Sequence, residues 1–381
     1  MPLTAGIVGM PNVGKSTLFN AITNSQVEAA NYPFATIAPN TGVVEVPDER
    51  LDHLCKIWSP LKRVAATFEF TDIAGLVKGA SKGEGLGNQF LANIRETDAI
   101  CHVVRCFRNN DILHVDGSVN SVRDAETINL ELIFADLDTV ENRISKVEKK
   151  AKATKDPELV AEYNALVLIK EALMNNLPAR SVDLSDEQAK IVKNFHLLTS
   201  KPMIYVANMG EEDIVDFNNN PEYIALKKQA EIENARIVPI CAKVEADLLE
   251  VTDPEEKQMF IDELGLKESG LDLLIKTAYD MLGLQTFLTC GKDECRAWTF
   301  KNGMTAPQCA GTIHTDFQKG FIKAEVYSYD DFVVYKSETA LKEAGKIRME
   351  GKEYIAKDGD IFFFRFNVWW ELDFQKTFIE L

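Results

Sequence analysis

The chain has 381 residues, of which 46% are hydrophobic and 27% are charged, and its formal net charge is −17. This length predicts two or three domains with a large core. The negative net charge argues against nucleic-acid binding over a broad basic surface, so that any contact with RNA needs a local basic patch. No run of about 18 apolar residues and no charged, apolar leader are present, which predicts a cytoplasmic protein with no membrane partner. The seven cysteines form no C-x-x-C pair, which predicts reduced thiols without a zinc site.

The first predicted element is a strand followed by a phosphate-binding motif. Ala5 to Val8 form an apolar run, and the residues from Gly9 to Ser16 (G-M-P-N-V-G-K-S) fit the P-loop pattern G-x-x-x-x-G-K-[ST]. A helix is predicted from Ser16 to Thr23, so that strand, loop and helix follow in the order that the motif requires. The pattern predicts a bound nucleoside triphosphate, held by backbone amides and by Lys15, with Mg²⁺ on the Ser16 hydroxyl. Lys15 is also a predicted catalytic residue, and the predicted nucleotide-binding residues of the loop are Asn12, Val13, Gly14, Lys15, Ser16 and Thr17.

Two further stretches have the composition of nucleotide switches. The loop from 31 to 40 is rich in Pro and Asn, and Thr36 is the candidate hydroxyl that joins the Mg²⁺ shell when the γ-phosphate is present; an ordinary Thr in a Pro-rich turn is the alternative. Asp72-Ile73-Ala74-Gly75 directly follows a strand predicted from 66 to 71. In that place Asp72 is expected to hold Mg²⁺ through water, and the Gly75 amide to bind the γ-phosphate.

The residue after Gly75 is Leu76, where many GTPases place the glutamine that orients the attacking water. Because leucine forms no such hydrogen bond, hydrolysis is expected to be slow or to use another group. His114 has the only imidazole in the polar loop from 108 to 117 that follows a strand predicted from 99 to 106, and it is the catalytic candidate. A loop histidine with no catalytic role remains the alternative.

An insertion from 120 to 200 is predicted to be helical. Apolar residues three and four apart from Leu130 to Val147 predict one helix, and Asp156-Pro157 predicts the start of a second, which gives an antiparallel hairpin that projects as an arm. Ser185 and Gln188 resemble a capping box at the start of a third helix. A basic run at the arm tip suits RNA phosphates, although a solvated tip is the alternative; it consists of Arg143, Lys146, Lys149, Lys150, Lys152 and Lys155.

After the insertion, an apolar strand from 203 to 207 leads into the loop Asn208-Met209-Gly210-Glu211. GTPases have N-K-x-D at the corresponding place, and the Asp of that motif accepts two hydrogen bonds from guanine. Here Met209 replaces the Lys and Glu211 replaces the Asp, which makes guanine selection doubtful. Asn208, Met209 and Glu211 are the predicted base-side residues.

With these motifs together, the chain resembles the YchF subfamily of Obg-like P-loop proteins over nearly its whole length. The resemblance implies a preference for ATP over GTP, Mg²⁺ at Ser16 and Thr36, and a hydrophobic residue at Leu76. It also implies a coiled-coil arm, a C-terminal TGS domain, and association with the ribosome, for which we expect the large subunit and an RNA contact through the arm or the TGS domain. The matching stretches are Gly6 to Asn20, Asn31 to Gly42, Asp72 to Phe90, Asn208 to Glu211, His314 to Phe317 and Gly320 to Val326.

The predicted fold is α/β: a P-loop NTPase domain over 1–284, with a mostly parallel sheet flanked by helices and the helical insertion at 120–200. Residues 285–368 are expected to form a ubiquitin-like β-grasp (TGS) domain, and the tail 369–381 has no predicted role. The predicted function is a ribosome-associated ATPase switch that hydrolyses ATP slowly with Mg²⁺ in translation or stress response. A GTP-specific GTPase of the Obg type is the alternative, and a small-molecule kinase is a third possibility. The kinase is the weakest, because Thr36 and the D-x-x-G motif belong to switches and no Arg-bearing lid is evident.

Overall fold

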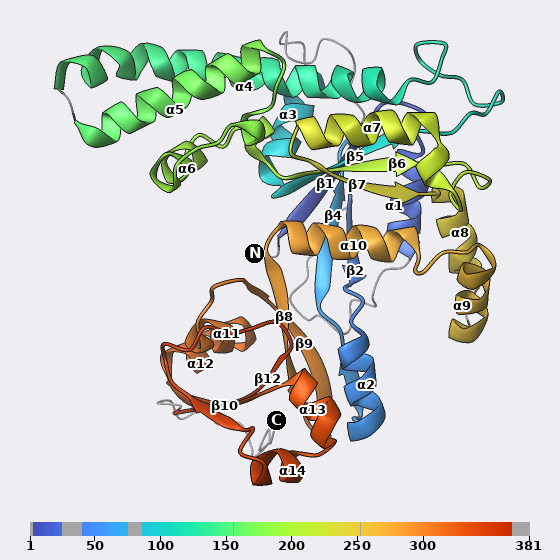
Figure 1. Ribbon diagram of the computed structural model, residues 1–381, viewed down its shortest axis with the longest axis vertical. Helices are drawn as coiled ribbons and strands as arrows, with labels where there is room; N and C mark the ends of the chain where they lie inside the picture. The colour runs from blue at the N-terminus through green and yellow to red at the C-terminus, as the bar shows by residue number, and fades with distance from the viewer. Residues whose placement is uncertain (1–2, 25–39, 75–85, 155, 252, 368–381) are drawn as a thin grey trace. The chain divides into compact units, whose positions relative to one another are not determined.

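The structure is a computed structural model that describes residues 3–24, 40–74, 86–154, 156–251 and 253–367 (Figure 1). The chain divides into two compact units. The first contains the described residues up to 44 and residues 69–278, and the second contains residues 45–68 and those from 279 onward. No helix in the described part is long and apolar enough to cross a membrane.

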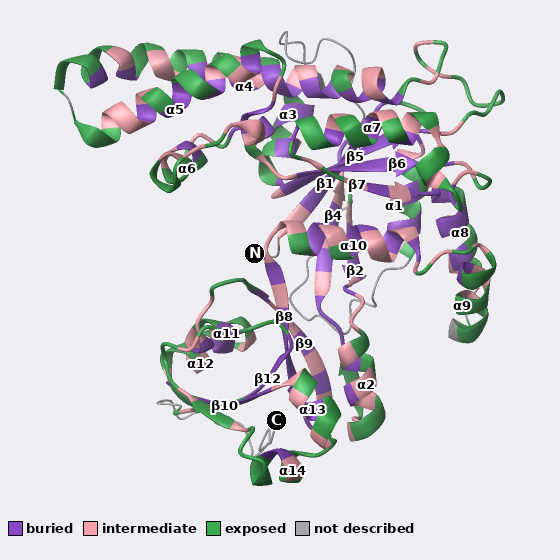
Figure 2. Cartoon of the chain, in the orientation of Figure 1, coloured by how far each residue is buried: buried purple, intermediate pink, exposed green. Residues whose placement is uncertain are grey.

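The first unit is built on a sheet with the strand order β2-β4-β1-β5-β6-β7. The pairs β4-β1, β1-β5, β5-β6 and β6-β7 are all parallel. The neighbouring inner strands β5 and β6 are buried along their whole length, as expected for a sheet that is covered on both faces (Figure 2). The carboxyl ends of the parallel strands therefore meet at one edge, where ligands bind in open α/β sheets. The strands are β1 (Thr4–Gly9), β2 (Thr41–Glu45), β4 (Thr67–Asp72), β5 (Ala99–Arg105), β6 (Met203–Asn208) and β7 (Arg236–Ile240).

Helices cover this sheet. Figure 1 shows α4 and α7 next to each other over β5 and β6, and α1 packs against α8. Several helices start at side-chain caps followed by proline, as at Asn220-Pro221 and Asp253-Pro254, where the cap accepts hydrogen bonds from free amides of the first turn. In the first unit, the described helices outside the insertion are α1 (Lys15–Asn24), α3 (Leu86–Glu96), α7 (Pro221–Ile232), α8 (Ala242–Glu250), α9 (Pro254–Glu263) and α10 (Gly270–Met281), with a 3-10 turn, η5 (Phe217–Asn219).

The insertion forms the predicted helical hairpin. Helix α4 (Ser121–Thr154) has 34 residues, so that it is about 50 Å long, and α5 (Pro157–Met174) packs against it. Asp156 caps α5 by accepting a hydrogen bond from Glu158 N, and Ser185 and Gln188 form the predicted capping box of α6 (Asp186–Lys193). An apolar cluster fills the hairpin and includes Ile133, Val140, Val147, Leu166, Ile169 and Leu173, and two 3-10 turns follow, η3 (Ala179–Ser181) and η4 (Leu198–Ser200).

The second unit contains a sheet of order β11-β10-β12-β8-β9-β3, which confirms the β-sheet predicted for the C-terminal part. The hairpin of β8 and β9 is antiparallel, and β12 runs parallel to β8 and antiparallel to β10 around a core of phenylalanines. The assignment as a β-grasp TGS domain stays a prediction. The strands are β8 (Leu284–Cys290), β9 (Glu294–Lys301), β10 (Phe321–Ser328), β11 (Arg348–Glu350) and β12 (Asp360–Phe366), and the helices are α11 (Ala306–Ile313), α12 (Thr315–Lys319), α13 (Tyr329–Tyr335) and α14 (Glu338–Glu343).

The sequence did not predict the contribution of residues 45–68 to this second unit. Helix α2 (Glu49–Trp58) and strand β3 (Lys62–Val64) lie in this segment, and β3 pairs in parallel with β9. The Arg50 guanidinium lies 2.7 Å from an Asp358 carboxylate oxygen, an ion pair between residues that are 308 positions apart. The C-terminal sheet is thus completed by a segment from the N-terminal part of the chain.

Candidate nucleotide-binding site

The P-loop connects β1, which ends at Gly9, to α1, which begins at Lys15. Asn12 and Gly14 have φ angles of 62° and 92°, which lie in the left-handed region that Gly and Asn adopt at the lowest cost. A Cβ atom on Gly14 would lie 2.1 Å from Asn208 Nδ2, so that position 14 has no room for a side chain. The loop therefore has the tight backbone on which phosphate binding by amides depends.

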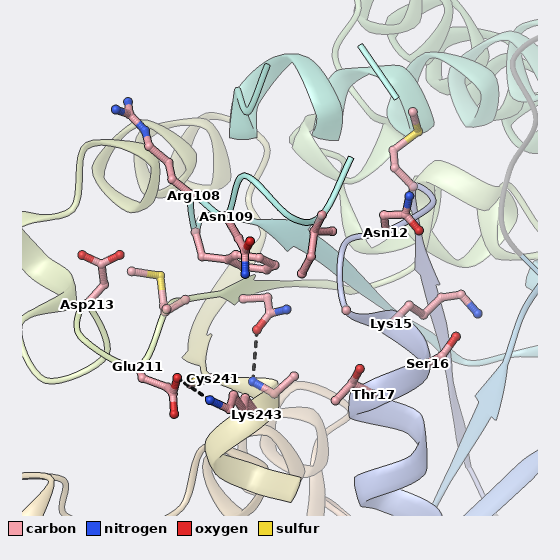
Figure 3. Close-up of a pocket in the computed structure, with 18 of the residues that line it drawn as sticks. Asn12, Lys15, Ser16, Thr17, Arg108, Asn109, Glu211, Asp213, Cys241 and Lys243 are labelled. Atoms are coloured by element: carbon pink, nitrogen blue, oxygen red, sulfur yellow. Dashed lines mark hydrogen bonds and ion pairs between the residues drawn. The ribbon is translucent and has the colours of Figure 1, made fainter. Parts of the chain in front are cut away.

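A cavity of about 930 Å³ opens beside the P-loop (Figure 3). Its volume is at the upper end of the range for small-molecule sites, which is large enough for a nucleoside triphosphate. The residues that line it belong to four segments: the P-loop from Met10 to Thr17, the loop after β5 from Phe107 to Ile112, the loop after β6 from Asn208 to Asp213, and Cys241 to Lys243 at the start of α8. Most of the nucleotide-binding residues predicted in the P-loop line the cavity, namely Asn12, Gly14, Lys15, Ser16 and Thr17. Val13 is buried, and its carbonyl oxygen accepts a hydrogen bond from Asn208.

Lys15 and Asp72 form an ion pair beside the P-loop, where the sequence predicts that the phosphates bind. They meet because β1 and β4 are parallel neighbours in which Ile7 lies opposite Asp72, so that β4 delivers its last residue next to the P-loop. The Lys15 side chain is 12% exposed. The structure thus brings the predicted metal-associated carboxylate to the predicted phosphate-binding lysine.

The loop from Asn208 to Asp213, which we call the base loop because the sequence predicts that it contacts the base, is connected to the P-loop by Asn208. Its Nδ2 donates to Val13 O over 2.8 Å, and its Oδ1 accepts from Ala242 N over 3.1 Å, while the residue is 4% exposed. Both polar ends of the amide are therefore bound to backbone groups from two other segments. In this geometry Asn208 holds the walls of the cavity together, a role that the sequence pattern did not reveal.

Met209 and Glu211 occupy different environments within the same loop. Met209 is 2% exposed, and its amide donates to Ile240 O over 2.7 Å, which fixes the loop against β7. The Glu211 side chain is 50% exposed and forms an ion pair of 2.7 Å with Lys243 (Figure 3). Glu211 thus presents its carboxylate at the cavity. Its ion pair with Lys243 was not predicted from the sequence.

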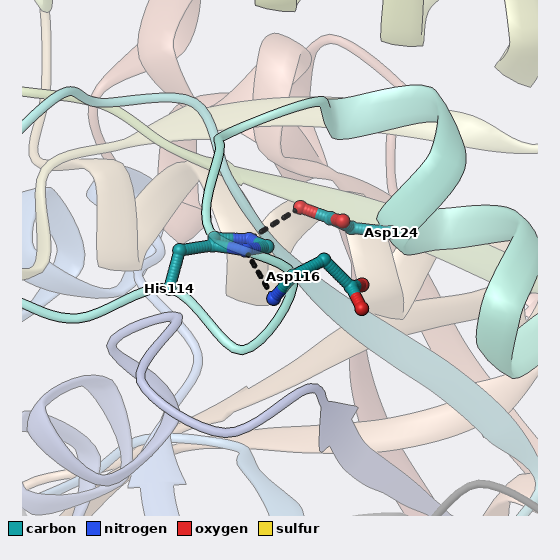
Figure 4. A group of neighbouring side chains, drawn as sticks. All are labelled: His114, Asp116 and Asp124. Atoms are coloured by element: carbon teal, nitrogen blue, oxygen red, sulfur yellow. Dashed lines mark hydrogen bonds and ion pairs between the residues drawn. The ribbon is translucent and has the colours of Figure 1, made fainter.

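His114 is held by its own loop and by the first turns of α4 (Figure 4). Its Nδ1 accepts from Asp116 N over 3.1 Å, and its Nε2 lies 2.8 Å from Asp124 Oδ2, so that Nε2 carries the proton and donates it. Its side chain is 7% exposed, and it is not among the residues that line the cavity. The catalytic role of His114 therefore stays a prediction.

The predicted positions Thr36, Gly75 and Leu76 lie outside the described residues, and so does Lys155 of the basic run at the arm tip. The sequence also did not identify the loop from Phe107 to Ile112 as a wall of the cavity. The available signal was its position, an irregular stretch directly after a fully buried strand of a parallel sheet.

Comparisons with known proteins agree with this arrangement. Residues 4–136 match the family described as 50S ribosome-binding GTPase, and residues 284–367 match the family YchF-GTPase_C, described as protein of unknown function (DUF933). The chain is 57% identical to the ribosome-binding ATPase YchF of Bacillus subtilis (strain 168) over 368 residues, which are 97% of this chain and 100% of that protein. The chain belongs to the YchF family.

Other YchF proteins are also similar to this chain over nearly their whole length. The ribosome-binding ATPase YchF of Escherichia coli O157:H7 is 54% identical over 97% of this chain and 100% of its own length. The solved structure of the Schizosaccharomyces pombe YchF GTPase superposes with a TM-score of 0.85 at 41% identity, covering 95% of this chain and 97% of that one. A GTP binding protein from Pyrococcus horikoshii OT3 has a TM-score of 0.58 at 20% identity over 96% of this chain and 100% of its own, which establishes a common fold only.

Proposed function

We propose that this protein is a ribosome-binding ATPase that binds ATP with Mg²⁺, hydrolyses it slowly and acts in the cytoplasm as a nucleotide-dependent switch. The observation that carries the choice of ATP is the base loop, in which Met209 and Glu211 stand where guanine-binding proteins have Lys and Asp. Support for the remainder comes from the P-loop geometry and from the ribosome-binding ATPases of two bacteria, each more than half identical to this chain.

The physical basis of the base preference is the position of one carboxylate. Guanine presents two adjacent N–H donors to an Asp at this place, whereas adenine presents an amino group and a ring acceptor. Glu211 is one methylene longer than Asp, and its carboxylate pairs with Lys243, which competes with a bidentate contact to guanine. A site without that contact loses the main reason to prefer GTP.

The donor set at the phosphate end fits Mg²⁺. Ser16 lines the cavity, and Asp72 pairs with the neighbouring residue Lys15, so that the P-loop offers a hydroxyl and has a carboxylate beside it. Ser16 and Thr36 would bind the ion directly and Asp72 through water, and the ion would neutralise charge on the β- and γ-phosphates. Lys15 would exchange its contact with Asp72 for the phosphate oxygens, while the backbone amides of the loop orient the triphosphate.

A GTP-specific enzyme is the second candidate, favoured by the match of residues 4–136 to a GTPase family and by the name of the Schizosaccharomyces pombe protein. The matched range ends before Asn208, so that it does not contain the residues that select the base. The base loop itself therefore decides between the two nucleotides.

One competition experiment tests the proposal. Labelled ATP bound to the protein in the presence of Mg²⁺ is displaced with unlabelled ATP or GTP, and we expect ATP to compete at the lower concentration. Lys15→Ala is the control for binding through the P-loop, and it should weaken both nucleotides. Equal or tighter binding of GTP by the unmodified protein would contradict the proposed ATPase and favour the GTP-specific enzyme.

The arm is the proposed contact with RNA of the large ribosomal subunit. Two cations of the basic run at the arm tip are already engaged, since Arg143 pairs with Glu162 and Lys152 pairs with Glu148. Lys146, Lys149 and Lys150 are exposed and form no ion pair with any residue that the structure describes. These three lysines, which we call the tip lysines, are therefore the candidates for phosphate contacts.

Neutralising the tip lysines to glutamine should weaken co-sedimentation with ribosomes and flatten its dependence on salt by a slope of about 2 to 3 on logarithmic axes. A matched control changes the same charge on exposed residues of α6 and α7, with Lys190, Lys227 and Lys228 replaced by glutamine. ATP turnover of the isolated protein should remain unchanged in both variants. If both variants bind ribosomes equally at every salt concentration, the arm is not the contact, and the sheet of the C-terminal unit becomes the surface to test.

A further inference from the structure

Arg105 is the last residue of β5 and one of the largest fully buried side chains in the described part of the chain, with 1% exposure. Its guanidinium donates three hydrogen bonds, all to backbone carbonyls of the loop that follows: Nε to Phe107 O over 3.2 Å, Nη2 to Asn109 O over 3.0 Å and Nη1 to Ile112 O over 3.1 Å. Its Cζ also lies 4.5 Å from the centre of the Phe107 ring. One side chain thus fixes three points of a single loop.

Burying the charged guanidinium of Arg105 in this way has a free-energy cost. Arg105 forms no ion pair with any carboxylate in the described residues, and burial lowers the pKa of its guanidinium, partly offset by the charge of Asp124. A buried charge is stabilised only when its hydrogen bonds are satisfied, and here carbonyl dipoles provide that stabilisation. Lysine has its donors at a single nitrogen, so that it cannot reach three carbonyls that are spread around a planar fork.

The loop that Arg105 fixes forms the wall of the cavity away from the phosphate end. Phe107, Asn109 and Ile112 line the cavity, and no helix or regular strand from 107 to 112 defines their positions. Figure 3 shows Asn109 on the same side of the cavity as Glu211, with Lys15 on the other side. A Cβ atom on Gly210 would lie 3.6 Å from Phe107 Cβ, so that Phe107 packs directly against the base loop.

We propose that Arg105 is the positioning residue of the base end of the nucleotide site: its three hydrogen bonds hold Phe107, Asn109 and Ile112 where they contact the base. This inference rests on the proposed binding of ATP and extends it to a residue outside the cavity lining. The wall built by Arg105 contacts the nucleoside, whereas the P-loop contacts the phosphates. Changing Arg105 therefore weakens ATP without weakening a ligand that consists of phosphates alone.

The test compares the affinities of Mg·ATP and Mg·tripolyphosphate by isothermal titration calorimetry in Arg105→Lys. We expect ATP affinity to fall about ten-fold or more, which equals the loss of about 1.4 kcal/mol, while tripolyphosphate affinity stays within about two-fold. Arg180→Lys is the matched control, because Arg180 is also buried in the first unit but binds Glu233 and does not line the cavity. It should leave the ratio of the two affinities unchanged.

A folded Arg105→Lys protein with an unchanged ratio, or with equal losses for both ligands, overturns the proposal. If Arg105→Lys does not fold, Phe107→Ala decides, because it removes part of the wall and keeps the buried guanidinium. Loss of ATP affinity alone in Phe107→Ala supports the proposal, and full retention overturns it. A wild-type protein that binds ATP no better than tripolyphosphate would contradict the proposed function itself, an outcome that is independent of either variant.

Discussion

Replacing Asn208 with Ala should weaken the P-loop, which Asn208 contacts directly although Val13 is 195 positions away in the sequence. The side chain is the bridge between Val13 O and Ala242 N, and both of these backbone groups are buried. Without Asn208 each is left without its partner, at a cost of about 1 to 3 kcal/mol per group. Water that enters the space next to Gly14 offsets part of this loss, so that we expect the free energy of unfolding to fall by about 2 to 4 kcal/mol.

The assay is urea denaturation of the protein without nucleotide, combined with titrations of ATP and tripolyphosphate. Because Asn208 holds the P-loop, both ligands should lose affinity together. A residue that instead read the base would lower the affinity for ATP alone. The matched control is Asn129→Ala, since Asn129 is buried and donates to Tyr205 and Glu233 at the base of the insertion.

Asn129→Ala should reduce stability by a similar amount and leave both affinities near their starting values. The reasoning is refuted if Asn208→Ala unfolds within about 1 kcal/mol of the wild type and still binds tripolyphosphate normally. Asn208→Asp is an informative intermediate, because its carboxylate still accepts from Ala242 N but cannot donate to Val13 O. It should bind both ligands more weakly than the wild type.

His114→Ala should lower single-turnover hydrolysis of ATP about 100-fold while the affinity for ATP stays constant, and unchanged turnover would leave the side chain with a structural role only. Glu211→Asp should raise the affinity for GTP relative to that for ATP in the competition assay, and an unchanged ratio would mean that the base is recognised elsewhere. Met209 is left unchanged in this variant, because at 2% exposure a lysine ammonium in its place would not be hydrated. Burial raises the pKa of Glu245 to about 7, so that between pH 4.5 and 7 the folded state holds a proton that the unfolded state has lost, and stability falls as pH rises. Glu245→Gln has no proton to lose in this range, and its amide oxygen still accepts from Gly270 N. In urea denaturation, the free energy of unfolding of Glu245→Gln minus that of the wild type should therefore increase by about 3 kcal/mol from pH 4 to pH 8. A difference that does not vary with pH would contradict this.

The sequence by itself determined the features whose causes lie within a few residues. Strand, glycine-rich loop and helix follow one another from Thr4 to Asn24 as the motif requires, and Asp156-Pro157 starts α5 where the cap and the proline predict it. The capping box of Ser185 is also local, since its partner is three residues away. Such contacts form with little loss of chain entropy, and their patterns are therefore visible in the sequence.

Tertiary structure decided the features whose partners are far apart in the chain. Asn208 reaches Val13 across 195 positions, and Lys15 meets Asp72 because parallel strands place both at one edge of the sheet. Strand β3 joins a sheet formed mainly from residues after 284, which no local pattern in Lys62–Val64 indicates. The physical reason is that side-chain identity sets what a residue can bind, whereas the packing of the whole chain decides which of many equivalent groups comes within reach.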